Sequence, residues 1–389
     1  MQPVRILADD LTGALDTAGC FASAASPLPV IFDAALLPDA KRWAASTASR
    51  DLAESEAVAR NARFLPNFAR HGGIAFKKID SLLRGHVAAE IALHVRRGDF
   101  DSTVIAPAFP ALGRVTRKGR QWAKLAGQNN YDMVGPDLVS DFARFGIDLK
   151  LGLSNAPQSG SPRIFLADAE TDDDLKTIVD AGMLCGRVLW CGCAGLADIL
   201  AGGGERASAP IAPRMLVICG TRHSVASLQT KPLETNENAT CVRLRPNGDL
   251  ASVAQTVNER LRAGHWAALV ADLPQLSADA ARGMLGKMMD DLFPQLDRPD
   301  ALFVMGGDTL AICCGALGAK SLAVRGLLTR GIPVSEFADG VWAGMTVISK
   351  SGAFGAEDTL IRIMEMTGAI DSGNATAAHG ELRQKAFRH

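Results

Sequence analysis

The feature that most constrains the fold of this chain is a repeated alternation of short apolar runs with stretches of helical periodicity. Chains that alternate in this way typically build parallel sheets whose strands are joined by crossover helices. Both halves of the chain show the alternation, so the predicted fold class is α/β throughout. The candidate strands are residues 4–8, 28–32, 74–79, 102–106, 162–167 and 187–191 in the first half, and 215–219, 240–244, 266–271, 301–305, 332–337 and 346–350 in the second.

The chain has 389 residues, which is too long for one ordinary hydrophobic core and indicates two domains. Glycine, proline and small polar residues replace all periodicity over 201–214, so the boundary is expected there. We predict two doubly wound, Rossmann-like domains, 1–205 and 214–371, with the active site in the cleft between them. The tail, 372–389, is expected to add little to either core.

Charge and hydropathy exclude several partners. Lys and Arg total 41 against 42 for Asp and Glu, so no global field draws the chain to nucleic acid or to an anionic membrane. The apolar run before Asp9 is too short for a signal peptide, and no 18-residue apolar stretch occurs. A cytoplasmic protein that acts on small molecules is expected, and its oligomeric state is left open, with a homo-oligomer as one alternative.

The eight cysteines have no zinc-ligand spacing and mostly lie inside apolar runs. Buried free thiols are the favoured interpretation. A redox pair of Cys191 and Cys193 is the minor alternative.

The sharpest local feature is ILADDLTGALDTAG, in which an apolar strand runs into Asp9 and Asp10 just before a helix. Ligands of open parallel sheets bind at the carboxyl ends of strands, and two adjacent acids there need a partner. The alternative is that Asp10 only caps the helix, because Asp is a favoured cap.

A second cluster, FKKIDSLLRGHVAAEI, places Lys77, Lys78, Asp80, Ser81 and Arg84 between the end of an apolar strand and an amphipathic helix. Cations and hydroxyls beside a helix N-terminus form an anion site, although a solvated run of charges is the alternative. Arg50 follows another possible strand end, and Arg is the better clamp for a carboxylate. The basic loop of residues 114–120 either holds an anionic substrate or is a surface turn.

Three strands of the second half end in polar or glycine turns, near Thr221, Gly306 and Gly352. The turn Gly306-Gly307-Asp308-Thr309 is the best polyphosphate candidate, since glycines let backbone N–H groups approach phosphates at a helix N-terminus. A packing turn is the alternative. No G-x-x-x-x-G-K-[ST] occurs, and no G-x-G-x-x-G follows the first strand, so a P-loop protein and a dinucleotide dehydrogenase are disfavoured.

Taken together and in this order, these segments resemble the four-carbon acid sugar kinase family. The matching stretches are ADDLTGALDTA, the SR at 49–50, KKIDSLLRGHVAAEI, APAFPALGR, DAETDDDL, GCAGLA, CGTRHS, GGDT and KSGAFG, which span nearly the whole chain.

The resemblance implies ATP-dependent phosphorylation of the terminal hydroxyl of threonate, erythronate or a 3-oxo-tetronate. The sugar acid would bind the N-terminal domain and ATP the C-terminal domain, with Mg²⁺ neutralising the phosphates. Asp10 is expected to be the base or the orienter of the attacking hydroxyl, and Asp80 is able to exchange roles with it. Matched by motif, the sugar-acid residues would be Asp10, Arg50, Lys78, Ile79, Asp80, Ser81 and Arg84, and the ATP residues Thr221, Gly306, Gly307, Asp308, Thr309 and Gly352.

Two positions depart from the family pattern, which usually has serine where this chain has Cys193 and Thr221. Threonine keeps the hydroxyl, whereas cysteine loses a strong donor. The alternatives to the tetronate kinase are a kinase for another oxo or branched sugar acid, a non-catalytic sugar-acid or nucleotide sensor, and a sugar-phosphate hydrolase.

Overall fold

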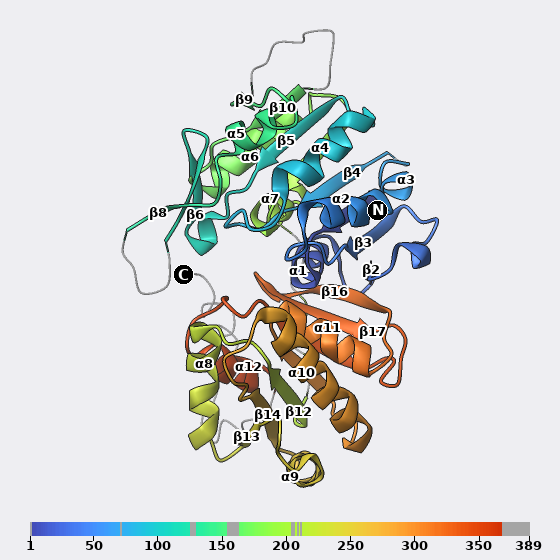
Figure 1. Cartoon of the computed structure of the whole chain (residues 1–389), viewed down its shortest axis with the longest axis vertical. Coiled ribbons are helices and arrows are strands. Elements are labelled where there is room, and N and C mark those ends of the chain that lie inside the picture. The colour runs from blue at the N-terminus through green and yellow to red at the C-terminus, as the bar shows by residue number, and fades with distance from the viewer. Residues whose placement is uncertain are drawn as a thin grey trace, which may run out of the picture. The chain divides into compact units, whose positions relative to one another are not determined.

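A computed structural model of the protein describes residues 2–70, 72–124, 130–153, 163–203, 207, 210 and 212–367. The chain divides into two compact units, one of Met1–Glu205 with Ser321–Gly326, the other of Arg206–Lys320 with Leu327–His389 (Figure 1). Each unit is built on a mainly parallel sheet, so the predicted α/β class with two domains is confirmed. The placement of the active site in a cleft between the domains stays a prediction, and the predicted tail, 372–389, lies outside the described residues.

The sheet of the first unit runs in the order β16-β2-β3-β1-β4-β11-β5-β10-β9, and its strands are parallel except where β16 pairs with β2. The central strands β1, β4, β5 and β11 are buried along their whole length, as strands covered on both faces must be. The strands are β1 (Val4–Ala8), β2 (Leu28–Ile31), β3 (Arg42–Ser46), β4 (Ile74–Lys78), β5 (Ser102–Ala106), β9 (Lys150–Leu151), β10 (Arg163–Leu166), β11 (Val188–Gly192) and the start of β16 (Ser321–Thr329).

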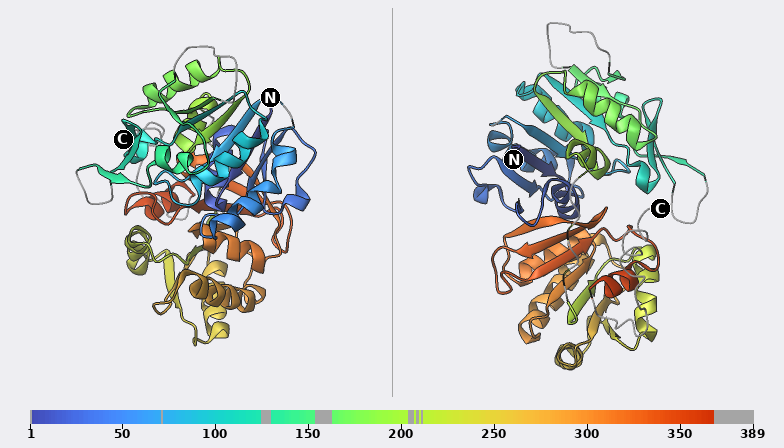
Figure 2. Two further views of the ribbon diagram at one scale, coloured as in Figure 1. Left: turned by 45° about the horizontal axis from the view of Figure 1, so that its top comes forward. Right: turned by 180° about the vertical axis from the view of Figure 1, so that it is seen from behind.

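Helices cover both faces of this sheet. One core packs side chains of α3 to α5 and their flanks, including Phe68, Ile91 and Phe142, onto Leu7, Trp43 and their neighbours. On the other face helix α7 contacts both α1 and α6, which Figure 2 shows from behind. The helices are α1 (Leu11–Phe21), α2 (Glu54–Ala62), α3 (Leu65–Phe68), α4 (Val87–Arg97), α5 (Leu138–Ala143), α6 (Asp172–Gly182) and α7 (Ala194–Leu200), with short 3₁₀ turns η1 (Ala34–Leu36) and η2 (Pro110–Leu112).

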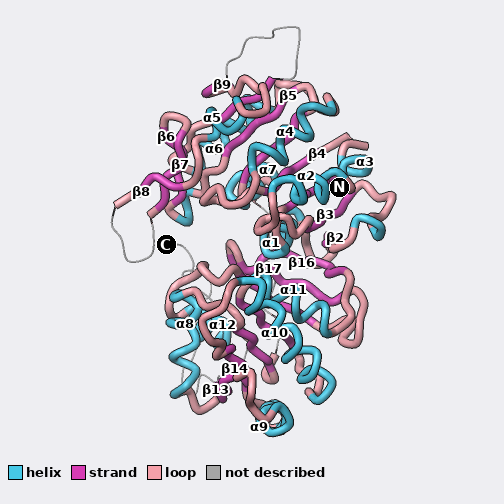
Figure 3. The backbone as a smooth tube through the Cα atoms, viewed as in Figure 1, coloured by secondary structure: helices cyan, strands magenta, loops and turns pink. Residues whose placement is uncertain are grey.

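The second unit has the parallel order β13-β14-β12-β15-β18, with β17 antiparallel beside β18. Helices α9, α10 and α11 pack side by side, and α8 contacts α12 (Figure 3). The elements are β12 (Met215–Cys219), α8 (Ser224–Thr230), η3 (Lys231–Thr235), β13 (Ala239–Leu244), α9 (Leu250–Arg262), β14 (Trp266–Ala271), α10 (Ala278–Leu292), η4 (Phe293–Gln295), β15 (Ala301–Met305), α11 (Gly307–Ala316), β17 (Ile332–Phe337), β18 (Thr346–Lys350) and α12 (Thr359–Met366).

Four parts of the described fold were not among the predicted strands, and the shortest of them is the two-residue strand β9. Strand β3 reads RWAAS and β16 reads SLAVRGLLT, and neither is an uninterrupted apolar run. The segment predicted as a basic loop, 114–120, instead forms strand β6 (Arg114–Arg117) and the start of β7 (Arg120–Ala123), which make a separate antiparallel sheet with β8 (Asp132–Val134). Among the described residues no helix is long and apolar enough to cross a membrane.

Candidate active site

The first cluster of polar side chains lies at the carboxyl edge of the first unit's sheet. Strand β1 lies between β3 and β4 and is parallel to both. The residues that follow these three strands therefore meet: Asp9 and Asp10 after β1, Arg50 in the loop after β3, and Asp80 after β4. The sequence placed each of them after a strand, and the strand order brings them together.

Asp10 serves two purposes, because it caps a helix and also binds an arginine. Its Oδ1 accepts the N–H of Gly13 at 3.0 Å, and its Oδ2 accepts the Thr12 hydroxyl at 2.7 Å, so it is the N-cap of α1. The same carboxylate accepts Arg50 Nη2 at 2.7 Å. The side chain keeps 20% of its surface exposed, which leaves room for a further donor.

Arg50 joins the carboxylates of this edge. Its Nε and Nη2 bind the two oxygens of Asp9, each at 2.8 Å, in the bidentate geometry that suits arginine. Its Nη1 lies 3.6 Å from Asp80 Oδ2. Gly85 has a positive φ of 83°, and a Cβ there would lie 3.1 Å from Asp9 Oδ2 and 3.5 Å from the Arg50 side chain. A residue larger than glycine would press on this pair.

Lys77 and Lys78 point to opposite faces of the sheet, as successive strand residues must. Lys77 is fully buried, and its Nζ pairs with Glu90 Oε2 of α4 at 2.6 Å. Lys78 lies on the side of α1, where a Cβ on Gly13 would come within 3.1 Å of its Nζ. Its ammonium donates to the Ile79 carbonyl at 2.9 Å. Lys78 thus belongs to the polar cluster, whereas the prediction that Lys77 belongs there too is wrong, because the pleat turns Lys77 to the opposite face and into the packing against α4.

The predicted residues after β4 have different surroundings. Asp80 Oδ2 accepts Arg84 at 3.1 and 2.5 Å, while its Oδ1 accepts the Leu82 N–H at 2.8 Å. Arg84 is 59% exposed, so its guanidinium is the most open cation of the cluster. The Ile79 side chain lies in the hydrophobic core, so only its backbone faces the polar edge.

Charge sets the protonation of both candidate bases. Burial raises the pKa of Asp10, but Arg50, Lys78 and the Thr12 hydroxyl outweigh it and leave the pKa below its usual range. Burial likewise raises the pKa of Asp80, and Arg84 and Arg50 bring it well below that range. Both carboxylates are therefore ionised at neutral pH.

Gln121 of β7 is a site residue that the sequence did not indicate. Its amide donates to the Ser81 carbonyl at 2.9 Å and to the Pro107 carbonyl at 3.3 Å, while its oxygen accepts the Thr116 hydroxyl at 2.7 Å. The small sheet is thereby fastened to the loop that carries Asp80. No motif marks such a residue, because its role depends on two loops far apart in the chain.

The cysteines behave as buried thiols. All eight are free and six are buried, as the sequence interpretation expects, whereas Cys185 and Cys241 are half-buried. Cys193 Sγ lies 3.2 and 3.1 Å from the carbonyls of Pro107 and Ala108, and burial raises its pKa to about 11. Burial also raises the pKa of Cys191. Neither thiol is poised as a thiolate, so the redox alternative has no support.

The second cluster consists of three turns at the carboxyl edge of the second unit's sheet. Thr221 follows β12, Gly306 follows β15 and Gly352 follows β18. A Cβ on Gly306 would lie 3.2 Å from Thr221 Cβ, and one on Gly352 would lie 2.6 Å from Thr221 Oγ1. The threonine is therefore packed between the two glycine turns, which have no room for side chains.

The turn at Gly306 opens into α11. Gly306 is the N-cap, with a φ of 105° that favours glycine, and its N–H donates to the Lys350 carbonyl at 2.9 Å. The first N–H groups of α11 have no side-chain cap at this residue, so the helix end is suited to an anion. Thr309 is buried near the turn, whereas Asp308 is exposed and pairs with Arg282 of α10 at 3.2 Å.

Lys350 is a second residue that the predicted site did not contain. It ends β18, is buried, and donates from Nζ to the Ser351 carbonyl at 2.9 Å. Burial lowers its pKa to about 8. Lys350 is the first residue of the KSGAFG stretch, and the sequence signal for it is a lysine at the end of an apolar strand just before a glycine turn.

Comparison with known proteins then decides the family. Residues 4–144 match a sugar-binding N-terminal domain, and residues 216–360 match a nucleotide-binding C-terminal domain. A D-threonate kinase of Bordetella bronchiseptica is 30% identical over 407 residues, which cover 92% of this chain and 96% of that protein. The chain belongs to the four-carbon acid sugar kinase family.

Further similarities extend over the same length. A D-threonate kinase of Cupriavidus necator is 29% identical, with 91% of this chain and 95% of the relative covered. A solved structure from Salmonella typhimurium LT2 is 18% identical and has a TM-score of 0.70, with 92% of this chain and 98% of that chain covered. At 18% identity this likeness shows only that the two proteins share a fold.

The residues were also tested for a metal site. Within the described ranges, no group of three or more His, Cys, Asp or Glu side chains is arranged to hold a metal ion. Asp9, Asp10 and Asp80 are engaged by arginines. A resident metal bound by a protein cage therefore does not fit these residues, whereas a Mg²⁺ ion held chiefly by phosphates needs only one or two carboxylates.

Proposed function

We propose that this chain transfers the γ-phosphoryl group of ATP to the terminal hydroxyl of a four-carbon sugar acid. D-threonate is the first candidate, since the curated relatives are D-threonate kinases; erythronate and 3-oxo-tetronates follow. The observation that carries the proposal is the cluster of ionised Asp10 and Asp80 around Arg50, with Lys78 and Arg84 at its edge. Such a cluster provides an acceptor for a hydroxyl beside cations for a carboxylate.

Asp10 is the better placed of the two carboxylates to receive the hydroxyl. Asp80 is only 7% exposed and has both oxygens engaged, by Arg84 and by the backbone of Leu82, whereas Asp10 is 20% exposed. A carboxylate with a lowered pKa is a weak base, which suits phosphoryl transfer through a loose transition state, where orientation counts for more than early proton removal.

The reaction balances with these groups. The substrate oxygen forms a bond to Pγ, the bond from Pγ to the ADP oxygen breaks, and the hydroxyl proton passes to Asp10. Arg84 and Lys78 would hold the acid's carboxylate, while Arg50 keeps the acidic residues in place. In the second unit, the N-terminus of α11, the Gly352 turn and the Thr221 hydroxyl would bind the phosphates, and Mg²⁺ would arrive with ATP and neutralise them.

The test is ADP formation from Mg-ATP over a panel of D- and L-threonate, D- and L-erythronate and 3-oxo-tetronates. We expect turnover with one acid, and a loss of about 10²-fold or more in kcat for Asp10→Asn. Asp180→Asn, on the exposed side of α6, is the matched control and should leave kcat unchanged.

Each other outcome selects an alternative. Turnover with a longer or branched oxo acid alone would change the substrate and keep the reaction. Binding of ATP and acid without turnover would indicate a sensor. Phosphate release from a sugar phosphate without ATP would indicate a hydrolase.

A further inference from the structure

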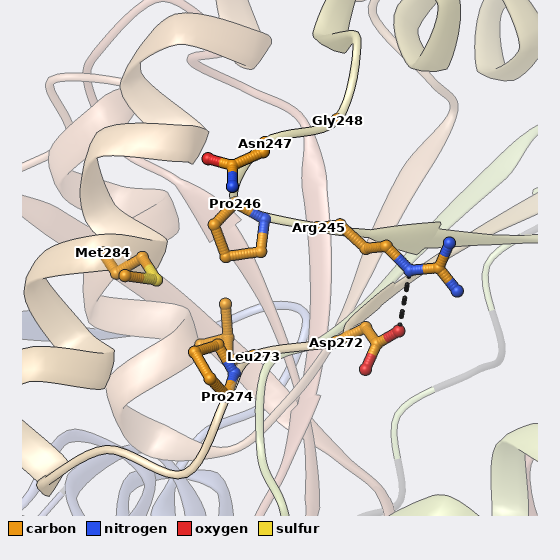
Figure 4. Close-up of a pocket in the computed structure, with 8 residues that line it drawn as sticks. All are labelled: Arg245, Pro246, Asn247, Gly248, Asp272, Leu273, Pro274 and Met284. Atoms are coloured by element: carbon orange, nitrogen blue, oxygen red, sulfur yellow. Dashed lines mark hydrogen bonds and ion pairs between the residues drawn. The ribbon is translucent and has the colours of Figure 1, made fainter.

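The second unit contains a pocket to which neither the sequence nor the relatives assign a role. Its volume is about 730 Å³, within the usual range for small-molecule sites. Segments after β13 and β14 line it together with Met284 of α10 (Figure 4). All of these residues belong to one unit.

Its lining is apolar with few polar groups. Pro246, Leu273, Pro274 and Met284 surround a common space, and Asn247 lies at one side of it (Figure 4). At the other side Arg245 Nε donates to Asp272 Oδ2 at 2.9 Å. A four-carbon acid, which is small and polar throughout, would not use these walls. A planar base would lie between them, with the Asn247 amide as donor and acceptor for its edge.

The pocket lies at the same edge of the sheet as the phosphate turns. Strands β13, β14, β12, β15 and β18 are parallel neighbours, so their carboxyl ends line up. Asp272 follows β14, which is the strand next to β12 and Thr221. Neighbouring strands lie about 4.8 Å apart, so the ends of β14 and β13 are roughly 5 to 10 Å from the end of β12. One extended nucleotide can span that distance.

Helix α10 links the two places directly. Met284 lines the pocket, and the next residue, Leu285, lies where a Cβ on Gly220 would meet it at 2.5 Å. Arg282 of the same helix pairs with Asp308 at the start of α11. One helix therefore holds both the pocket wall and the glycine turns.

We propose that this pocket holds the nucleoside of the phosphoryl donor. The base lies between Pro246, Pro274 and Met284, and Asp272 accepts the ribose hydroxyls. The inference rests on the proposed function, in which the second unit binds ATP, and goes beyond it by placing the base and ribose.

The first test uses the unaltered protein and 8-azidoadenosine triphosphate. Photolabelling that ATP suppresses should map to peptides that contain 245–248 or 272–284. Suppressible labelling confined to other peptides would overturn the inference. If the protein neither binds ATP nor gives labelling that ATP suppresses, both this inference and the proposed ATP-dependent function fail.

The second test separates the base from the phosphates. Met284→Trp fills the pocket and should raise the Kd for ATP by about tenfold or more while leaving that for inorganic tripolyphosphate unchanged. Asp290→Trp, exposed on the same helix, is the control and should change neither constant. Unchanged ATP affinity in Met284→Trp, with turnover retained, would overturn the pocket assignment and leave the kinase standing. An equal loss of affinity for ATP and for tripolyphosphate would also contradict the assignment, because the substitution would then have disturbed the phosphate turns and not the base pocket.

Discussion

The lysine pair at the end of β4 shows how two neighbouring residues serve different purposes. Lys78 lies in the polar cluster, whereas Lys77 forms a buried ion pair with Glu90. Glu90 Oε1 also accepts the Ser49 hydroxyl at 2.5 Å, and the Ser49 N–H donates to the Asp9 carbonyl at 2.9 Å. The buried pair thus supports the loop that carries Arg50.

Removing one partner of this pair should be costly. We expect Glu90→Gln to lower the free energy of unfolding by about 3 kcal/mol, because it leaves the Lys77 charge buried and unpaired. Urea denaturation measures it. The double variant Lys77→Met with Glu90→Leu, which buries no charge, should recover most of the loss; a double variant as unstable as the single one would contradict this account.

Lys350 should make stability depend on pH. Burial lowers its pKa to about 8 from an ordinary value of 10.5, so between these values the unfolded chain binds more protons than the folded one. The free energy of unfolding contributed by Lys350 therefore rises as pH increases from about 8 to 10.5.

Comparison with Lys350→Met isolates this contribution. The variant lacks the buried amine, so its stability relative to the original protein should be highest near pH 7 and should fall by pH 10. Denaturation series from pH 7 to 10 measure the difference in free energy of unfolding between variant and original protein. Lys287→Met, on the exposed surface of α10, is the control for removal of a lysine that is not buried. A difference that does not change over this range would show that Lys350 stays charged in the fold.

Among the elements, the turn after β18 depends on the absence of a single side chain. A Cβ on Gly352 would lie 2.6 Å from Thr221 Oγ1 and 2.9 Å from its Cγ2, so the threonine or the turn must move. We expect Gly352→Ala to weaken ATP binding by about tenfold while the fold persists, since the site has lost a close approach rather than core packing.

A glycine in the neighbouring helix provides the contrast. A Cβ on Gly315 of α11 would meet nothing within 4 Å. Gly315→Ala should therefore leave ATP binding unchanged and raise stability by about 0.5 to 1 kcal/mol. Calorimetric titration and thermal unfolding of both variants check the pair; equal ATP affinity in Gly352→Ala would remove that turn from the phosphate site.

At the scale of the whole molecule, the first unit needs a strand from far along the chain. Residues Ser321–Val324 of β16 pair with Leu28–Ile31 of β2, so residues 1–205 alone would leave β2 as an open edge. Open edges of this kind promote association between chains. We expect residues 1–205 to self-associate in sedimentation experiments.

A version of the fragment that regains the strand is the control. Residues 321–329 joined to 1–205 through a Gly/Ser linker should restore a single sedimenting species of fragment size. A fragment of residues 1–205 that remains monodisperse by itself would show that the pairing with β16 is dispensable.

The sequence by itself determined the class of the fold and the candidate motifs. The apolar runs from 4–8 to 346–350 predicted buried parallel strands, because both faces of such strands are covered and the whole run must be apolar. Asp10 and Asp80 were found because each follows a predicted strand, Lys78 because it lies at the end of one, Arg50 because it follows a possible strand end, and the glycines at 306 and 352 because they lie in tight turns. Strands β3 and β16 were missed because arginine, serine and glycine interrupt their apolar character.

Only the tertiary structure decided which of these groups meet. The order β3-β1-β4 brings Arg50 onto Asp9, Asp10 and Asp80, and the pleat sends Lys77 to Glu90 and Lys78 to the polar edge. The order of the strands also places Thr221 between two glycine turns. It leaves a pocket at the ends of β13 and β14. No local pattern encodes such contacts, because strand order and helix packing are set by the burial of apolar surface over the whole unit, and a residue's chemistry depends on which strand end lies next to its own.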